Sequence, residues 1–486
     1  MQITEQQDII QQLYKERILV TSDILALIKE GKTYDEIVSQ VKASPDYVAP
    51  IIQPEPIQST RGPSAVKVIE TYKEAHREIK IHDFTSHFAV RLQKLTAILR
   101  QRSELENITS IARVKQKTDQ EKVSIIGFVS DIAETKNGHM MLTIEDKSGE
   151  MRCLAIKRDD NEAFEEAKNL SYDEVIGITG TNTEGDDKII FIDQILHPDV
   201  PNIIEFKKSP AEGRAAFISD LHFGAKVFLQ KEWDDFILFI NGKSPDPALN
   251  KVANEIQYLF IVGDMIEGAG IYPNQDQDVT HIDVREQYKI AAKEIAKIPS
   301  DIHIIICPGN HDTMRLSEPQ PPLYKEYAPD LLALPNVINV SSPSVVNIHS
   351  LDNFPGFNVL MYHGYSFFYY MNNIEYIRKA GGIERVDLVM EYLLKRRHLS
   401  PAHTSNLYIP DPDRDELIIK DIPDFFVSGH LHKFVAKNFK STTLLNCSCF
   451  VGVTDYQKKQ GMVPDVAKVA VVNLRTRDVQ VVDFSE

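Results

Sequence analysis

The sequence predicts a multidomain α/β protein with a small N-terminal helical domain, a β-barrel and a C-terminal α/β domain. The chain has 486 residues, which is enough for about three domains. A proline-rich stretch follows the first 43 residues, and after about residue 205 short alternating strands give way to strands that alternate with helices. Hydrophobic residues make up 43% of the chain and charged residues 26%, which is ordinary for a globular protein.

Residues 1–43 have the pattern of a small helical domain, in which Thr33 and Glu36 form a capping box ahead of a helix. Residues 44–80 contain five prolines together with Ser, Thr and Gly, a composition that predicts an extended linker. We therefore expect the helical domain to be tethered to the rest of the chain rather than packed into it.

A helix over 84–103 and five short strands after it predict an OB-type β-barrel domain over residues 81–205. The helix carries Phe88, Leu92 and Leu95 at helical spacing, and a further helical stretch precedes the fourth strand. Barrels of this type bind single strands or sugars, and they also serve as packing modules. Aromatic residues that could stack on bases are scarce on these strands, which favours the packing role.

Residues 213–486 alternate apolar strands with helical segments, as expected of an α/β domain with a largely buried sheet. Five of these strands end in residues that can bind metal or move protons. In chain order the strand ends carry Asp220-Leu221-His222, Gly263-Asp264, Pro308-Gly309-Asn310-His311-Asp312, His363-Gly364 and Gly429-His430-Leu431-His432. Because ligand sites of α/β sheets lie at the carboxyl ends of strands, we expect these groups to converge.

Each of these motifs alone is weak, since Gly, Asn and Asp are common turn residues. The joint pattern is specific, because several unrelated turns would have to choose metal ligands at matching strand ends. Imidazole and carboxylate ligands without thiolates suit Mn, Fe or Zn in a catalytic site rather than Ca. The donors exceed what one ion needs, which predicts two divalent metal ions, with Mn, Fe, Zn and Mg as the candidates.

In this order, the motifs resemble those of the calcineurin-like metallophosphoesterase family, which includes double-strand-break-repair nucleases. The resemblance implies an α/β sandwich over residues 213–486 and a role for each matching residue. It implies one metal held by Asp220, His222 and His432, a bridging Asp264, and a second metal completed by Asn310, His363 and His430. It also implies that His311 acts on the phosphate or the leaving oxygen as a catalytic residue, oriented by Asp312.

Two further stretches of sequence indicate a particular group within this family. Together with the order of the domains, LVMEYLLKRRHLSPAH (388–403) and NCSCFVGVTDYQKKQGMVPD (446–465) are similar to the small subunit of the archaeal family-D DNA polymerase. This resemblance implies a Mn-preferring 3′→5′ exonuclease that removes mispaired DNA 3′ ends and works with a large polymerising subunit in DNA replication. Related eukaryotic B-subunits share the architecture but lack the metal ligands, all of which this sequence keeps.

The net charge of −16 is unfavourable for binding nucleic acid through bulk electrostatics, so we expect the large subunit to supply much of the DNA binding. The sequence has no run of 18 or more apolar residues and no signal-peptide pattern, which predicts no membrane span. The four Cys include no C-x-x-C pair and fit reduced thiols. The expected location is cytoplasmic and associated with the nucleoid.

The basic run Lys395-Arg396-Arg397 has two interpretations. It can be a helix end, where cations complement the helix dipole. It can also contact DNA phosphate, and we keep it as a candidate nucleic-acid site.

Near the N-terminus, Gln7, Ile10, Leu13 and Tyr14 have the spacing of a sliding-clamp peptide. Leu13 stands where that peptide has an aromatic residue, and the same spacing describes an ordinary helix face, which we favour. The N-terminal region remains a candidate contact for a sliding clamp or a primase.

Two other functions remain open from the sequence. One is a stand-alone phosphoesterase acting on small phosphodiesters or phosphoproteins, and the other is a non-catalytic bridge within the replication machinery. The N-terminal domains argue against the first, since a hydrolase of small substrates has no need of them. The filled ligand set argues against the second.

Overall fold

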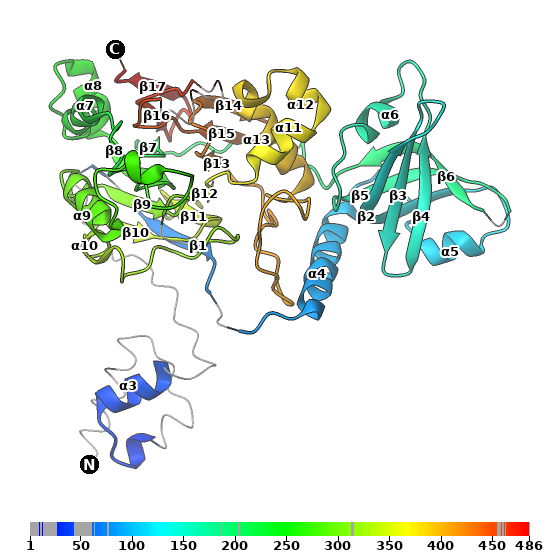
Figure 1. Ribbon diagram of the computed structural model, residues 1–486, viewed down its shortest axis with the longest axis horizontal. Helices are drawn as coiled ribbons and strands as arrows, with labels where there is room; N and C mark the ends of the chain where they lie inside the picture. Colours follow the sequence, from blue (N-terminus) through cyan, green and yellow to red (C-terminus); the bar gives the residue numbers. More distant parts are fainter. Residues whose placement is uncertain are drawn as a thin grey trace. The chain divides into compact units, whose positions relative to one another are not determined.

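The computed structural model describes residues 9, 12, 27–42, 61–62, 64–74, 77–185, 187–202, 205–312, 315–453, 458, 461 and 463–485. The chain divides into two compact units, residues 1–55 and 56–486 (Figure 1).

In the first unit, helix α3 (Tyr34–Lys42) begins at the predicted capping box. The Thr33 backbone N–H donates to Glu36 Oε2 at 2.9 Å, and the Glu36 N–H donates to Thr33 Oγ1 at 3.5 Å. Ile28 and Ile37 form a small buried core. The residues with the spacing of a clamp peptide lie outside the described residues: Gln7, Ile10, Leu13 and Tyr14.

The predicted OB-type barrel is confirmed as a closed five-stranded barrel in the order β2-β3-β4-β6-β5. Its strands are β2 (Lys122–Glu134), β3 (Met140–Asp146), β4 (Gly149–Ala155), β5 (Val175–Asn182) and β6 (Ile189–Leu196). Three helices accompany the barrel: α4 (Ile81–Leu99), α5 (Ile111–Gln116) and α6 (Glu162–Ala167). Leu92, Leu95 and Leu99 of α4 pack against Ile126 of the barrel, as the helical spacing predicts.

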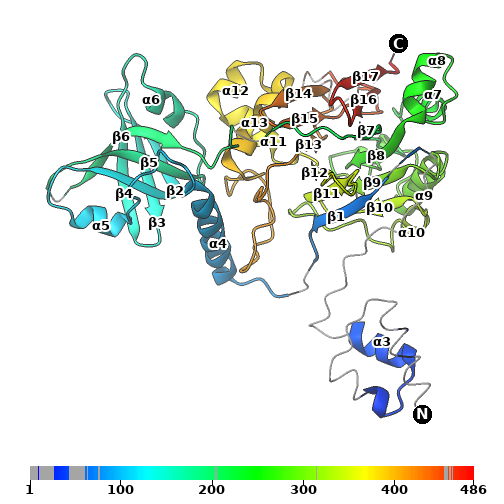
Figure 2. The ribbon, with the colours of Figure 1, turned by 180° about the vertical axis from the view of Figure 1, so that it is seen from behind.

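Two six-stranded sheets form the C-terminal domain (Figures 1 and 2). The first sheet has the order β1-β11-β12-β13-β15-β14, with β1 (Val66–Thr71), β11 (Ser344–Ile348), β12 (Phe357–Met361), β13 (Phe425–Ser428), β15 (Thr442–Asn446) and β14 (Val435–Phe439). The second has the order β10-β9-β8-β7-β16-β17, with β10 (Val337–Asn339), β9 (His303–Cys307), β8 (Ile256–Val262), β7 (Arg214–Ile218), β16 (Lys468–Asn473) and β17 (Val479–Asp483).

The two sheets pack face to face because side chains on each strand alternate between two apolar environments. Phe217 of β7 faces the other sheet, where its ring centroid lies 5.9 Å from that of Phe425 on β13. Within its own sheet, its ring centroid lies 5.0 Å from that of Phe260 on β8. Its neighbours Ala216 and Ile218 face the outer helices instead. Fully burying one such Phe stabilises the fold by about 1.5–3 kcal/mol. The predicted α/β sandwich is confirmed.

Helices cover the outer faces of both sheets. The second sheet is covered by α7 (Gln230–Ile240), α8 (Pro247–Asn254) and α9 (Val284–Ile295), with α10 (Pro329–Leu332) beside α9. The first sheet is covered by α11 (Phe367–Asn373), α12 (Glu375–Lys379) and α13 (Val386–Arg396). No helix within the described residues is both long and apolar enough to cross a membrane.

The predicted linker over 44–80 was wrong for the stretch that forms β1. This strand pairs antiparallel with β11, from Val66 opposite Ile348 to Thr71 opposite Ser344. The prolines that suggested a linker all precede it, and its VKVIET sequence alternates as an edge strand does. Residues 44–60 lie outside the described residues.

The predicted nucleic-acid contact of the basic run was wrong for Arg396 and Arg397. Arg396 is 3% exposed, and its Nε lies 3.1 Å from Glu174 Oε2 of the barrel. Arg397 is also buried, and its Nε donates to the Ile419 carbonyl at 2.8 Å. Lys395 is half-buried. Arg396 therefore holds the barrel to the sandwich, and Arg397 bonds within the sandwich. The run of cations in the sequence does not reveal that a barrel carboxylate lies beside it.

Candidate metal centre

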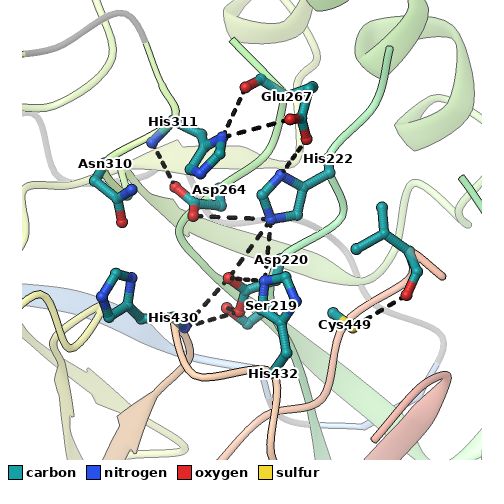
Figure 3. Close-up of polar contacts among 12 residues, drawn as sticks. Ser219, Asp220, His222, Asp264, Glu267, Asn310, His311, His430, His432 and Cys449 are labelled. Atoms are coloured by element: carbon teal, nitrogen blue, oxygen red, sulfur yellow. Dashed lines mark hydrogen bonds and ion pairs between the residues drawn. The ribbon is translucent and has the colours of Figure 1, made fainter. Parts of the chain in front are cut away.

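The side chains predicted from the strand ends come together at one edge of the two sheets (Figure 3). They follow β7, β8 and β9 in one sheet and β12 and β13 in the other. Three groups each have imidazole or carboxylate ligand atoms within 4.8 Å of one another: Asp220-His222-His432, His222-Asp264-His311 and Asp264-His363-His430.

Five of these residues have the left-handed backbone conformation that glycine favours. The φ values are 52° at Asp220, 49° at His222, 49° at Asp264, 69° at His430 and 54° at His432. This conformation costs on the order of 1–3 kcal/mol at a residue other than glycine and persists where the surrounding fold imposes it, commonly at functional sites. The cost here falls on five candidate ligands.

Gly309 allows the loop after β9 to lie against Asp264. A Cβ at this position would overlap Asp264 Oδ1 and the Asp264 backbone nitrogen. The close approach lets the His311 backbone N–H donate to Asp264 Oδ1 at 2.8 Å. This glycine therefore serves close packing at the site and is not only a turn residue.

The first cluster contains Asp220, His222 and His432. His432 Nε2 lies 3.3 Å from Asp220 Oδ1 and 3.2 Å from His222 Nε2. Burial opposes the charged form of His432, but the ion pair with Asp220 and the neighbouring Cys449 sulfur raise its pKa to about 10. Ser219 fixes the carboxylate, donating from Oγ to Asp220 Oδ2 at 2.5 Å.

The second cluster contains Asn310, His363 and His430 beside Asp264. His363 Nε2 lies 3.2 Å from Asp264 Oδ2 and 3.1 Å from Asn310 Oδ1. His363 Nδ1 donates to the Val262 carbonyl at 2.9 Å, which turns Nε2 toward the cluster. Burial alone would lower the pKa of His363, but the Asp264 carboxylate raises it to about 9. Burial lowers the pKa of His430 to about 3, so that ring is neutral.

These residues fit divalent metal ions. Asp220, Asp264, His222 and His363 are each at most 3% exposed, so their charges and ring nitrogens are withdrawn from water. Buried carboxylates surrounded by imidazoles within 4.8 Å match the mixed oxygen and nitrogen ligands of Mn, Fe or Zn. Asp264 belongs to two of the three groups, which places it between two candidate ion positions.

Glu267 is the residue of the site that the sequence did not reveal. Its Oε2 lies 2.8 Å from His222 Nδ1, and its backbone carbonyl accepts from His311 Nδ1 at 2.7 Å. A carboxylate behind a ligating imidazole fixes the ring and its tautomer. The one sequence signal for Glu267 is its position three residues after Asp264, and a carboxylate at that spacing is too common to identify a residue of the site.

The predicted contact of Asp312 with His311 was wrong. The Asp312 carboxylate accepts from the Gly309 N–H at 2.8 Å and from the Tyr288 hydroxyl at 3.0 Å. Burial, with the nearby Asp264 charge, raises the pKa of Asp312 to about 6. Asp312 therefore shapes the loop after β9, and Glu267 is the partner that orients His311.

A cavity of about 310 Å³ opens over the two clusters. Its walls are apolar as well as charged: Tyr365 and Phe368 stand beside His430, with ring centroids 5.7 Å and 5.3 Å from that imidazole. At its rim Leu316 is 40% exposed and Val463 is 67% exposed. The site can thus receive a ligand with both a charged part and a flat apolar part.

Glu318 lies buried beside the site and makes stability depend on pH. It accepts from the Tyr362 hydroxyl at 3.0 Å, and burial raises its pKa to about 8. A carboxyl whose pKa is raised on folding binds a proton more tightly in the folded state. Its contribution is full below the unfolded pKa of 4.5 and is lost as the pH rises through 8.

We therefore expect Glu318→Gln to flatten the pH dependence of stability. Between pH 5.5 and 7.5, the free energy of unfolding of the unsubstituted protein should fall by about 1.4 kcal/mol per pH unit more than that of the variant. Urea unfolding in metal-free buffer measures this difference, with Glu286→Gln, at a partly exposed carboxylate that pairs with Lys289, as the control. If the free energy of unfolding depended on pH in the same way in the protein and in its Glu318→Gln variant, the raised pKa of Glu318 would be contradicted.

Comparison with known proteins places the chain in a family. Residues 213–434 match the calcineurin-like phosphoesterase model, and residues 123–196 match the OB-fold nucleic acid binding domain model. The DNA polymerase II small subunit of Methanothermobacter thermautotrophicus is 33% identical over 466 residues, which cover 93% of this chain and 92% of that protein. The chain belongs to the DNA polymerase II small subunit family.

Other relatives carry the same name. The DNA polymerase II small subunit of Thermoplasma acidophilum is 33% identical, with 83% of this chain and 78% of that protein covered. That of Pyrococcus furiosus is 34% identical, with 84% of this chain and 64% of that protein covered. Every predicted metal ligand of this chain falls inside the calcineurin-like match, from Asp220 to His432. The predicted resemblance is confirmed.

Proposed function

We propose that this chain is the 3′→5′ exonuclease subunit of a DNA polymerase and works with a large polymerising subunit. The observation that carries the proposal is the pair of buried ligand clusters that share Asp264 on the floor of an open cavity. The relatives' name supports the partner, since a small subunit of a DNA polymerase implies a larger one.

Asp220, His222 and His432 would hold one divalent ion, and Asn310, His363 and His430 the other, with Asp264 between them. When bound, a pair of such ions stabilises the charge that develops on the attacking and leaving oxygens of a phosphodiester. We take Mn as the resident metal. Imidazole, carboxylate and amide-oxygen ligands without thiolate suit Mn, as they also suit Fe and Zn.

His311 is the proposed catalytic residue. Its Nδ1 is engaged by the Glu267 carbonyl, which leaves Nε2 for the phosphate or the leaving oxygen. Burial lowers the pKa of His311, so the ring is neutral at pH 7 and can exchange a proton with a reacting oxygen. His311 lines the same cavity as both clusters.

Tyr365 and Phe368 in the cavity wall favour the end of a nucleic acid strand as substrate over a phosphodiester without a base. A terminal base that is unpaired can lie against Phe368, and base–aromatic stacking contributes about 1–3 kcal/mol. We expect Phe368→Ala to raise KM for a single-stranded 3′ end about tenfold, while Phe368→Tyr restores it. Initial rates measured against DNA concentration test this.

A DNA whose last residue is abasic provides the control for that prediction. Without a base to stack, Phe368→Ala should change its KM less than twofold. Equal losses on the normal and abasic ends would contradict stacking, because they would indicate that the substitution disturbs His430 instead.

The proposed function is tested with end-labelled DNA duplexes that have a paired or a mismatched 3′ terminus. With Mn²⁺, the protein and its complex with the large subunit should shorten the labelled strand from the 3′ end, and the mismatched end faster. If small phosphodiesters are hydrolysed but DNA 3′ ends are untouched even in the complex, the exonuclease proposal fails and a small-substrate phosphodiesterase remains.

A further inference from the structure

A second groove lies between α4 and the barrel, away from the metal ligands. Its volume is about 810 Å³. It is lined by α4, by the 108–113 segment that includes the start of α5, by the end of β3 and the turn after it, and by one residue of β2. The lining residues are Leu92, Gln93, Thr96, Ala97, Arg100, Ile108, Thr109, Ser110, Arg113, Ile126, Asp146 and Lys147. Apart from Ile126, Asp146 and Lys147, these residues lie outside the match to the OB-fold model, and none of them is a candidate metal ligand.

Three cations line this groove from three different segments. Arg100 ends α4, Arg113 lies in α5, and Lys147 lies in the turn between β3 and β4. All three are exposed, and none of them forms an ion pair within the described part of the chain. In the same domain, by contrast, Arg102 pairs with Glu104 at 2.7 Å.

Among the described residues that line the groove, Asp146 is the one carboxylate, and it offsets only one of the three positive charges. Its two oxygens are held by neighbouring N–H groups rather than by the cations. Asp146 Oδ2 accepts from the Ile111 backbone N–H at 2.9 Å, and Asp146 Oδ1 accepts from the Ser148 N–H at 2.7 Å. The groove is therefore a local basic site in a chain whose net charge is −16. Such a site attracts an anion with several charges.

The polar lining favours a phosphate backbone over a protein segment. Thr96, Thr109, Ser110 and Gln93 supply hydroxyl and amide groups of the kind that contact phosphate and sugar. Among the described residues, none that lines the groove is aromatic and could stack on a base or anchor a peptide side chain.

We propose that this groove binds the sugar-phosphate backbone of a DNA strand without reading its sequence. The proposal rests on the proposed function only for the choice of DNA over RNA. Three phosphate contacts on a single strand give an affinity whose logarithm falls against the logarithm of salt concentration with a slope of about −2. Such contacts would hold the DNA on the barrel while the metal centre acts.

The test measures binding of a fluorescent single-stranded oligonucleotide to the full chain by anisotropy, in EDTA so that no hydrolysis occurs. The test variant carries Arg100→Ala, Arg113→Ala and Lys147→Ala. The matched control carries Lys94→Ala, Lys136→Ala and Arg158→Ala, which removes three exposed cations of the same region that lie outside the groove and form no ion pair within the described residues.

We expect the groove variant to bind at least tenfold more weakly at 50 mM salt, with a salt slope about 2 units smaller in magnitude. The control should lose much less affinity. Equal losses in the two variants would overturn the proposal, because they would indicate general electrostatics. Unchanged DNA binding together with weakened capture of the large subunit would also overturn it and would assign the groove to an acidic protein segment.

Hydrolysis of bis(p-nitrophenyl) phosphate with Mn²⁺ separates this proposal from the proposed function. The groove variant should hydrolyse this small diester at the rate of the unsubstituted protein, because the substitutions lie outside the metal centre. Loss of DNA binding with full hydrolysis supports the groove whether or not the enzyme proves to be an exonuclease.

Discussion

We expect Asp264→Asn to lower the rate of the proposed phosphodiester hydrolysis about 10³-fold and to leave the fold intact. Asp264 Oδ2 lies 3.2 Å from His363 Nε2 and 3.8 Å from His222 Nε2, so this carboxylate serves both clusters. The amide keeps the shape of the side chain but removes its charge. A loss of about 4 kcal/mol of charge stabilisation corresponds to a rate about 10³-fold lower. Initial rates on labelled DNA and on bis(p-nitrophenyl) phosphate measure it, and circular dichroism checks the fold.

The matched control for this substitution is Asp283→Asn. Asp283 caps α9 by accepting from the Arg285 N–H at 2.9 Å, a bond that an Asn side chain can also accept. We expect this variant to keep full activity. If Asp264→Asn retained more than a tenth of the rate, Asp264 would not be the shared ligand.

We expect His311→Ala to lower kcat by a factor of about 10² to 10⁴ and to leave metal binding in place. A positioned proton-transfer group contributes a factor of this size. His311 is expected to act on the substrate, whereas its backbone N–H, which the substitution keeps, is the group that contacts Asp264. Steady-state kinetics give kcat, and elemental analysis of the purified variant gives its metal content.

His281→Ala is the control, since His281 is exposed and its Nδ1 contacts the Thr280 hydroxyl at 3.1 Å. It should match the unsubstituted protein in rate and in metal content. A His311→Ala variant that loses metal along with activity would instead make His311 a ligand, as its place in one of the three clusters would allow.

The sequence could predict that the candidate metal ligands lie together, because each follows closely after a buried strand. In an α/β sheet the strand direction fixes where the next residue lies, so Asp220, Asp264 and His363 had to share an edge. The barrel was predictable for a similar reason, since its strands alternate in hydrophobicity over short lengths between turns.

The remaining features depend on contacts between segments far apart in the sequence. Glu267 orients His222 only because the loops after β7 and β8 lie side by side. Arg396 is turned inward by Glu174, which lies in a different domain. Residues 66–71 form strand β1 by pairing with β11, which lies far away in the sequence. No local pattern of residue types carries such information, so these three roles could not be predicted from the sequence.

The most direct test of the metal centre is the number of Mn²⁺ ions that one chain binds. Equilibrium dialysis of the purified protein should give two ions per chain, and the His363→Ala, His430→Ala double variant should give one, because the cluster of Asp220, His222 and His432 remains. One ion or none in the unsubstituted protein, or a count that the double variant leaves unchanged, would contradict a site in which two ions share Asp264.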